Sequence, residues 1–82
     1  MGYTVEYYEK DDGSRPAEEF ILSQDNKMQA KIFKNLELLE IRGNELREPF
    51  SKHIEDGIFE IRNKVGNDIT RIFYFFVIGQ KI

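Results

Sequence analysis

Two arginines, Arg62 and Arg71, are the side chains in this sequence best suited to chemistry. They lie in consecutive segments joined by a tight reversal, so if these segments pair as strands, the two side chains would share one face of a sheet. Two guanidiniums held close together repel each other unless an anion lies between them. An RNA phosphate suits that position, because arginine stays protonated and its planar fork binds phosphate oxygens in pairs. The pattern leaves an equal alternative open, a solvated ion network in which Glu60 or Asp68 pairs with one arginine.

Other residue types offer weaker sites. The single His53 has no cysteine or second histidine to join it, so we predict no metal site and no cofactor. A serine–histidine–aspartate triad lacks a nucleophile-elbow pattern, and we predict that His53 is a partly exposed residue before a strand. Gly57 and Gly66 are predicted turn residues and do not indicate a phosphate-binding loop. The aromatic run 73–76 is a possible base-stacking platform, but its hydrophobic setting favours core packing.

The N-terminal part of the chain predicts a strand and a short helix that would support this site. Residues 3–9 alternate, with Tyr3, Val5 and Tyr7 on one face, which is typical of a half-buried strand. Ser14 is the expected cap of a helix over residues 16–23. Phe20 is expected to be the apolar anchor of this helix.

A longer helix is predicted to follow. Asp25 or Asn26 would cap it, and it would run to about residue 42 and stop at Gly43. Its buried stripe is expected to contain Met28, Ile32, Leu36 and Leu39, widened by Phe33.

From residue 50 the hydrophobic period changes to two. Residues 58–63 predict a strand with Phe59 and Ile61 inward, and with Glu60, Arg62 and Lys64 on the other face. Residues 65–68 form a reversal, and residues 69–77 form the most hydrophobic strand, which we place in the middle of the sheet. The predicted fold class is therefore α+β: a strand, a helical hairpin, and a small antiparallel sheet packed against the helices.

Length and composition limit the range of functions. With 82 residues we expect a single domain over 1–82, and the absence of cysteine excludes a disulfide scaffold. We expect no signal peptide and no membrane span, and therefore a cytoplasmic protein. The net charge of −3 argues against simple nucleic-acid binding. However, residues 57–82 carry four Lys/Arg against two Asp/Glu, so an anion-binding surface is expected in this last third.

Two segments of the chain resemble a known family. Residues 50–62 (FSKHIEDGIFEIR) and 68–76 (DITRIFYFF) are similar to the signature of phage-derived HigB-like toxins in the RelE/ParE superfamily. The predicted order of elements is similar over nearly the whole chain.

This resemblance implies a type II toxin that is neutralised by a cognate antitoxin, expected to be a helix-turn-helix protein. RelE and HigB toxins are ribosome-dependent endoribonucleases that cut mRNA without a metal, whereas ParE relatives poison DNA gyrase. Arg71 and Arg62 match the family's arginines on the central and preceding strands, and so become candidates for stabilising charge on the phosphorane. Lys52 and Lys64 are candidate RNA contacts, and Glu60 is a candidate general base because it alternates outward beside Arg62.

Relatives usually continue with another strand and a basic C-terminal segment, so we expect this chain to be truncated at its C-terminus. A truncated chain could be a non-catalytic module that captures its antitoxin. The net charge of −3 favours this alternative, while the arginine pair favours the endoribonuclease. In either case, a strand 69–77 without a neighbour would offer its edge to an antitoxin or to a second copy.

Overall fold

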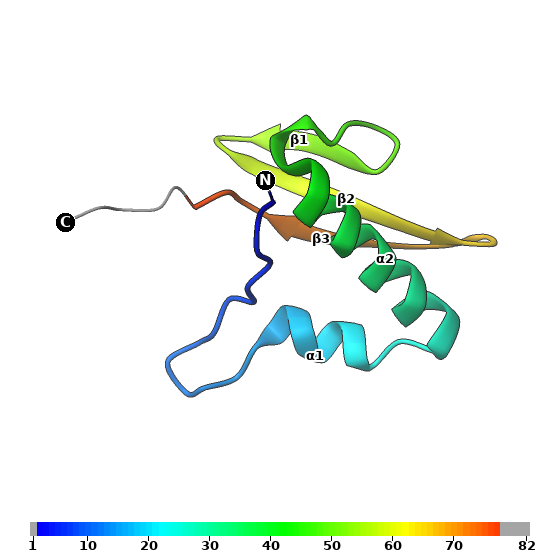
Figure 1. The fold of residues 1–82 in the computed structure, drawn as a ribbon. Helices are drawn as coiled ribbons and strands as arrows, with labels where there is room; N and C mark the ends of the chain where they lie inside the picture. The colour runs from blue at the N-terminus through cyan, green and yellow to red at the C-terminus, as the bar shows by residue number, and fades with distance from the viewer. Residues whose placement is uncertain (1, 78–82) are drawn as a thin grey trace.

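The chain folds as two helices followed by a three-stranded antiparallel sheet, and Figure 1 shows the longer helix lying across the sheet. The computed structural model describes residues 2–77. The elements are α1 (Pro16–Leu22), α2 (Asn26–Arg42), a short 3-10 helix η1 (Gly43–Glu45), β1 (Ser51–Glu55), β2 (Ile58–Val65) and β3 (Asp68–Tyr74). The predicted α+β fold class is confirmed.

Helix α2 has the boundaries that the sequence predicts. The Met28 N–H donates to Asp25 Oδ1 at 2.8 Å, which caps the first turn, and the helix ends at Gly43, whose φ is 56°. The four predicted stripe residues are buried: Met28, Ile32, Leu36 and Leu39. Phe33 is exposed, so its predicted place in the stripe is wrong. Asn35 is buried instead, since it follows Ile32 by three residues and therefore lies on the same side of the helix.

Helix α1 is anchored by Ile21, whereas the predicted anchor, Phe20, is exposed. Only one face of this seven-residue helix meets the core, and Ile21 lies on it. The predicted cap is also wrong, because Arg15 is the N-cap residue and makes no side-chain cap bond. The Ser14 hydroxyl and N–H instead donate to Asp12 Oδ1 at 2.7 and 2.9 Å. These two hydrogen bonds lower the pKa of Asp12.

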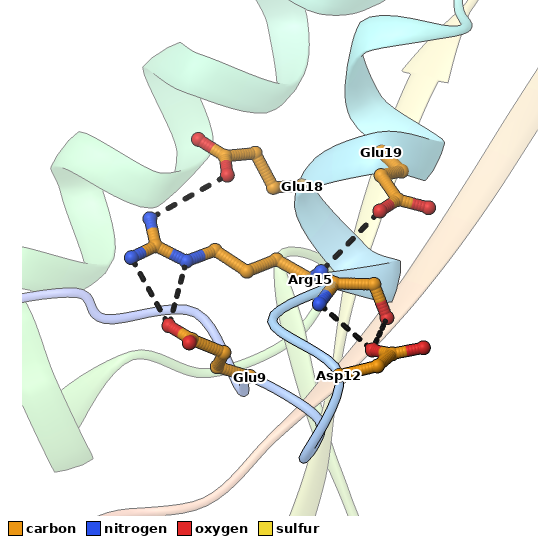
Figure 2. Close-up of polar contacts among 6 residues, drawn as sticks. Glu9, Asp12, Arg15, Glu18 and Glu19 are labelled. Carbon is orange, nitrogen blue, oxygen red and sulfur yellow. Dashed lines mark hydrogen bonds and ion pairs between the residues drawn. The ribbon is translucent and has the colours of Figure 1, made fainter.

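Arg15 ties the loop before α1 to the helix, as Figure 2 shows. Its guanidinium lies 3.2 Å from Glu9 Oε1 and 3.7 Å from Glu18 Oε1. Its backbone N–H donates to Glu19 Oε2 at 3.3 Å. Glu9, Arg15 and Glu19 are exposed and Glu18 is half-buried, so these ion pairs add little stability.

The N-terminal segment does not form the predicted strand; residues 2–10 have no regular secondary structure. Glu40, near the end of α2, takes two of the donors that a strand ladder would have used. The Tyr3 N–H donates to the Glu40 carbonyl at 2.8 Å, and the Val5 N–H donates to Glu40 Oε2 at 2.9 Å. The alternation still describes packing in part, because Val5 and Tyr7 are half-buried against the core.

The strand order is β1-β2-β3, so β2 is the central strand and β3 lies at an edge. The predicted central position of the last strand is therefore wrong for the part of the chain that the structure describes. β1 and β2 are joined at Asp56 and Gly57, with φ of 46° and 80°, as a type I′ turn requires. β2 and β3 are joined at Gly66 and Asn67, where Gly66 has a φ of 60°.

The core lies between α2 and one face of the sheet. Its buried apolar residues are Ile21, Met28, Ile32, Leu36, Leu39, Leu46 and Ile61. Ile61 supplies the sheet's contribution because β2, at the centre, is the strand that α2 contacts most closely. Within residues 2–77, neither helix has the length and hydrophobicity needed to cross a membrane.

Candidate nucleic-acid interface

Arg62 and Arg71 are directly opposite each other on β2 and β3, and they therefore share one face of the sheet, as the sequence predicts. Because Ile61 and Asn63 are fully buried toward α2, their neighbours on β2 point to the other side of the sheet. The pairing register extends this side across the three strands. We call it the open face and define it by Lys52, Glu55, Glu60, Arg62, Lys64, Ile69, Arg71 and Phe73.

The carboxylate of Glu60 pairs with both arginines. Its Oε2 lies 2.7 Å from Arg62 Nε and 3.5 Å from Arg71 Nε. The Glu60 side chain is only 8% exposed, whereas Arg62 and Arg71 are 34% and 51% exposed. The ion-network alternative is thus correct in naming Glu60, but this carboxylate pairs with both arginines and is buried, not solvated. Asp68 lies opposite Val65 and makes no ion pair in residues 2–77.

This ion network leaves both guanidiniums able to bind a further anion. Each arginine has five N–H donors, and both ion pairs with Glu60 use Nε. The outer Nη groups of Arg62 and Arg71 donate no hydrogen bond within residues 2–77, where the side-chain bond to Glu60 comes from Arg62 Nε. A buried carboxylate beneath two half-exposed guanidiniums can therefore hold them together and orient them, which is one way to prepare a phosphate site.

The open face is cationic although the chain is acidic. It contains four basic side chains, Lys52, Arg62, Lys64 and Arg71, against the carboxylate of Glu60 and that of Glu55, which lies opposite Ile58 at the end of β1. This is a formal excess of two positive charges on one face of a chain whose net charge is −3. Lys52 on β1 is opposite Glu60 on β2, and Lys64 follows Arg62 by two residues on β2. The predicted auxiliary cations therefore lie on the same face as the arginine pair.

A buried amide network supports the two strands from the helix side. Asn35 Nδ2 donates to Asn63 Oδ1 at 2.9 Å and to the Arg62 carbonyl at 3.2 Å. Asn63 Nδ2 donates to Thr70 Oγ1 at 3.3 Å, next to Arg71. These hydrogen bonds connect α2 to the backbone beneath both arginines. Sequence reasoning missed this network, although each asparagine is a polar residue at a position in phase with the core.

The aromatic run alternates between the two faces. Tyr74 and Phe76 are half-buried, as core packing predicts, and the Ser51 and Tyr74 hydroxyls share a hydrogen bond. Burial raises the pKa of Tyr74. Phe73 and Phe75 are 63% and 59% exposed, so core packing is the wrong interpretation for them. The reason is that no helix covers this face of the sheet in the described residues.

The sequence predicts that His53 precedes a strand, but in the structure it lies inside β1. It is exposed, and its ring meets the edge of Phe59 with centroids 5.0 Å apart. Among residues 2–77, no three His, Cys, Asp or Glu side chains gather in a way that could hold a metal ion.

A family model described as "Phage derived protein Gp49-like (DUF891)" matches residues 19–82 of the chain. The chain belongs to this Gp49-like family. The phage-derived character expected from the sequence is confirmed at this level, and the matched range includes the long helix and all three strands of the sheet. No curated protein and no solved structure matches the chain.

Proposed function

We propose that this Gp49-like protein is the toxin of a type II toxin–antitoxin system and acts in the cytoplasm as a ribosome-dependent endoribonuclease on mRNA. The observation that carries the proposal is the direct pairing of Arg62 with Arg71 on a cationic open face. Membership of a phage-derived family supports it. The resemblance of segments 50–62 and 68–76 to HigB-like toxins supplies the reaction.

In this reaction the 2′-oxygen of one nucleotide attacks the adjacent phosphorus, and the bond from phosphorus to the 5′-oxygen breaks. The 2′-hydroxyl proton passes to a base, and the leaving 5′-oxygen takes up a proton from an acid. Negative charge accumulates on the phosphorane oxygens between these steps. Arg62 and Arg71 would stabilise this charge with their outer N–H groups, because such preorganised donors contribute most where charge develops. Lys52 and Lys64 would bind flanking phosphates.

Glu60 has two possible roles in this scheme. Its Oε2 accepts a 2.7 Å hydrogen bond from Arg62 Nε and forms a longer ion pair, at 3.5 Å, with Arg71 Nε. Its burial and its two cationic partners support a role in positioning the arginines. The general-base role remains a prediction, which requires the other oxygen, Oε1, to reach a 2′-hydroxyl. Glu60→Gln separates the two roles, since the amide oxygen can still accept the hydrogen bond from Arg62 Nε but cannot take up a proton.

Substitution of Arg71 tests the proposal. Arg71→Ala should abolish growth inhibition on induced expression and lower ribosome-dependent mRNA cleavage at least about 100-fold, the typical effect of removing one charge-stabilising donor. The free energy of unfolding should change by less than about 1 kcal/mol, because the side chain is half exposed. Arg71→Lys should restore activity only in part, since an ammonium lacks the bidentate fork.

Arg42→Ala is the matched control. Arg42 is exposed in the last turn of α2, away from the open face, and its removal changes the net charge by the same amount. It should leave toxicity and cleavage unchanged. A folded Arg71→Ala protein that cleaves mRNA as well as the unsubstituted chain would refute the catalytic assignment.

A second candidate function is a non-catalytic module that binds an antitoxin. Two observations favour it: Glu60 already neutralises part of the arginine pair, and within residues 2–77 no strand pairs with the outer edge of β3. An extended antitoxin segment, or a second copy of this chain, could add a strand there. Sedimentation of the chain alone, and with any helix-turn-helix protein that is encoded beside it, tests this function. A monomer that binds no such partner would exclude it.

A further inference from the structure

Phe73 is an exposed aromatic residue within the cationic open face. Its side chain lies on β3, two residues after Arg71 and directly opposite Glu60 on β2. At 63% exposure it is too open to contribute much to the core. The neighbouring β3 residues Ile72 and Tyr74, by contrast, are half-buried and pack against the core.

The surroundings of Phe73 indicate what can cover it. Side chains two residues apart on a strand lie on the same face about 7 Å from each other, so the ring stands beside the Arg71 guanidinium. The Arg62 guanidinium lies across from Arg71, and Lys52 lies across from Glu60 on the far strand. The exposed ring is therefore next to cations on both its own strand and the neighbouring strands.

An apolar protein surface covering Phe73 would also have to remove these cations from water without providing counter-charges, which is costly. A single-stranded nucleic acid meets both requirements at once, because its phosphates neutralise the cations while an unstacked base covers the ring. A double helix offers no free base face for such stacking.

We propose that Phe73 stacks on a base of single-stranded RNA whose phosphate is bound by Arg62 and Arg71. This inference rests on the proposed function, since it assumes RNA as the ligand of the open face. It adds a base-binding position to a site otherwise made of phosphate contacts. It also gives the exposed half of the aromatic run a role that packing does not explain.

The test compares two probes of equal length, a labelled single-stranded oligoribonucleotide and an abasic ribose-phosphate oligomer, by fluorescence anisotropy at low salt. Phe73→Ala should weaken binding of the oligoribonucleotide between about 5-fold and 100-fold, the usual range for loss of one stacked base. It should leave binding of the abasic oligomer unchanged. Phe73→Trp should restore binding, while Arg71→Ala should weaken binding of both probes.

Phe75→Ala is the control for a general loss of apolar surface. Phe75 is 59% exposed but lies past the end of β3, farther from the arginines, so its removal should not affect either probe. Equal binding by the unsubstituted chain and Phe73→Ala, or equal losses for both probes, would overturn the stacking role while leaving RNA binding intact. A chain that binds neither probe would overturn this inference, whereas the proposed function is refuted only by loss of the Arg71→Ala effect on ribosome-dependent cleavage. A self-association that Phe73→Ala abolishes without affecting RNA binding would assign the ring to a protein interface instead.

Discussion

The buried amide pair of Asn35 and Asn63 should be energetically coupled, and this can be measured without knowing the function. Both side chains are almost completely buried, and Asn35 Nδ2 donates to Asn63 Oδ1 at 2.9 Å. A buried amide is costly unless its hydrogen bonds are made, so each residue is favourable only while the other is present. The perturbation is therefore a double-mutant cycle with Asn35→Leu, Asn63→Val and the combined variant.

The magnitude follows from the bonds that each substitution removes. Asn35→Leu removes two hydrogen bonds, to Asn63 Oδ1 and to the Arg62 carbonyl. Each is worth about 0.5–1.5 kcal/mol, and the orphaned Asn63 oxygen costs a further 1–3 kcal/mol or so. Burial of the added leucine offsets part of this, which leaves a net loss of about 2 kcal/mol. The double variant has no orphaned amide, so its loss should be smaller than the sum of the single losses by about 1 kcal/mol or more.

Equilibrium unfolding in urea, followed by far-ultraviolet circular dichroism, measures all four free energies. With a slope of about 1 kcal/mol per molar urea for a small domain, each single substitution should lower the midpoint by about 2 M. The slopes should stay constant, which shows that the substitutions change stability and not the extent of unfolding. If the two losses add within about 0.3–0.5 kcal/mol, the amides do not interact and this account of the network is refuted.

Three further predictions concern the core, the N-terminal segment and an ionisable side chain. Leu36→Ala should lower the free energy of unfolding by about 2–5 kcal/mol in thermal melts. The exposed Phe33→Ala should lower it by less than about 0.5 kcal/mol, and equal losses would contradict the buried stripe. Gly43→Ala should destabilise the chain, because the new Cβ would overlap the Tyr3 ring and the backbone φ is 56°. Adding Tyr3→Ala should recover part of the lost stability in the same melts. No recovery would exclude the contact. Burial raises the pKa of Tyr74, so the neutral phenol stabilises the folded state below about pH 10, and this contribution is lost as the pH rises through the folded-state pKa. Tyr74→Phe should therefore flatten the fall of the urea midpoint above about pH 10. Parallel curves for the two proteins would refute this.

The helical hairpin could be predicted closely because its signals are local. The Asp25 cap and Gly43 stop mark α2 by their own backbone requirements, and the spacing of the apolar stripe follows from the helical period. The predictions for α1 were wrong where another residue competed for the same hydrogen bond or the same buried position. Ser14 bonds to Asp12 instead of capping α1, and Phe20 is exposed because Ile21 takes the position facing the core.

The strands show the limit of prediction from pattern. Alternation in residues 3–9 correctly indicated that Val5 and Tyr7 turn toward the core, but it could not show that Glu40 would take the backbone donors of this segment. For β3, apolar residues on both faces suggested a central strand. The same composition occurs at an edge when one face packs on the core and the other carries exposed apolar residues such as Phe73.

The arginine pair was predictable because a short turn fixes long-range register. A two-residue turn at Gly66 and Asn67 makes Val65 face Asp68, and Arg62 and Arg71 each lie three residues outside that pair, so they must face each other. The state of the pair was not predictable to the same degree. Whether Glu60 reaches one arginine or both depends on side-chain directions across two strands, and its burial depends on the arginines that cover it. The register of the two strands can therefore be derived from the sequence, whereas the ion pairs between their side chains cannot. For a site built on paired strands, the position is easier to predict than the mechanism.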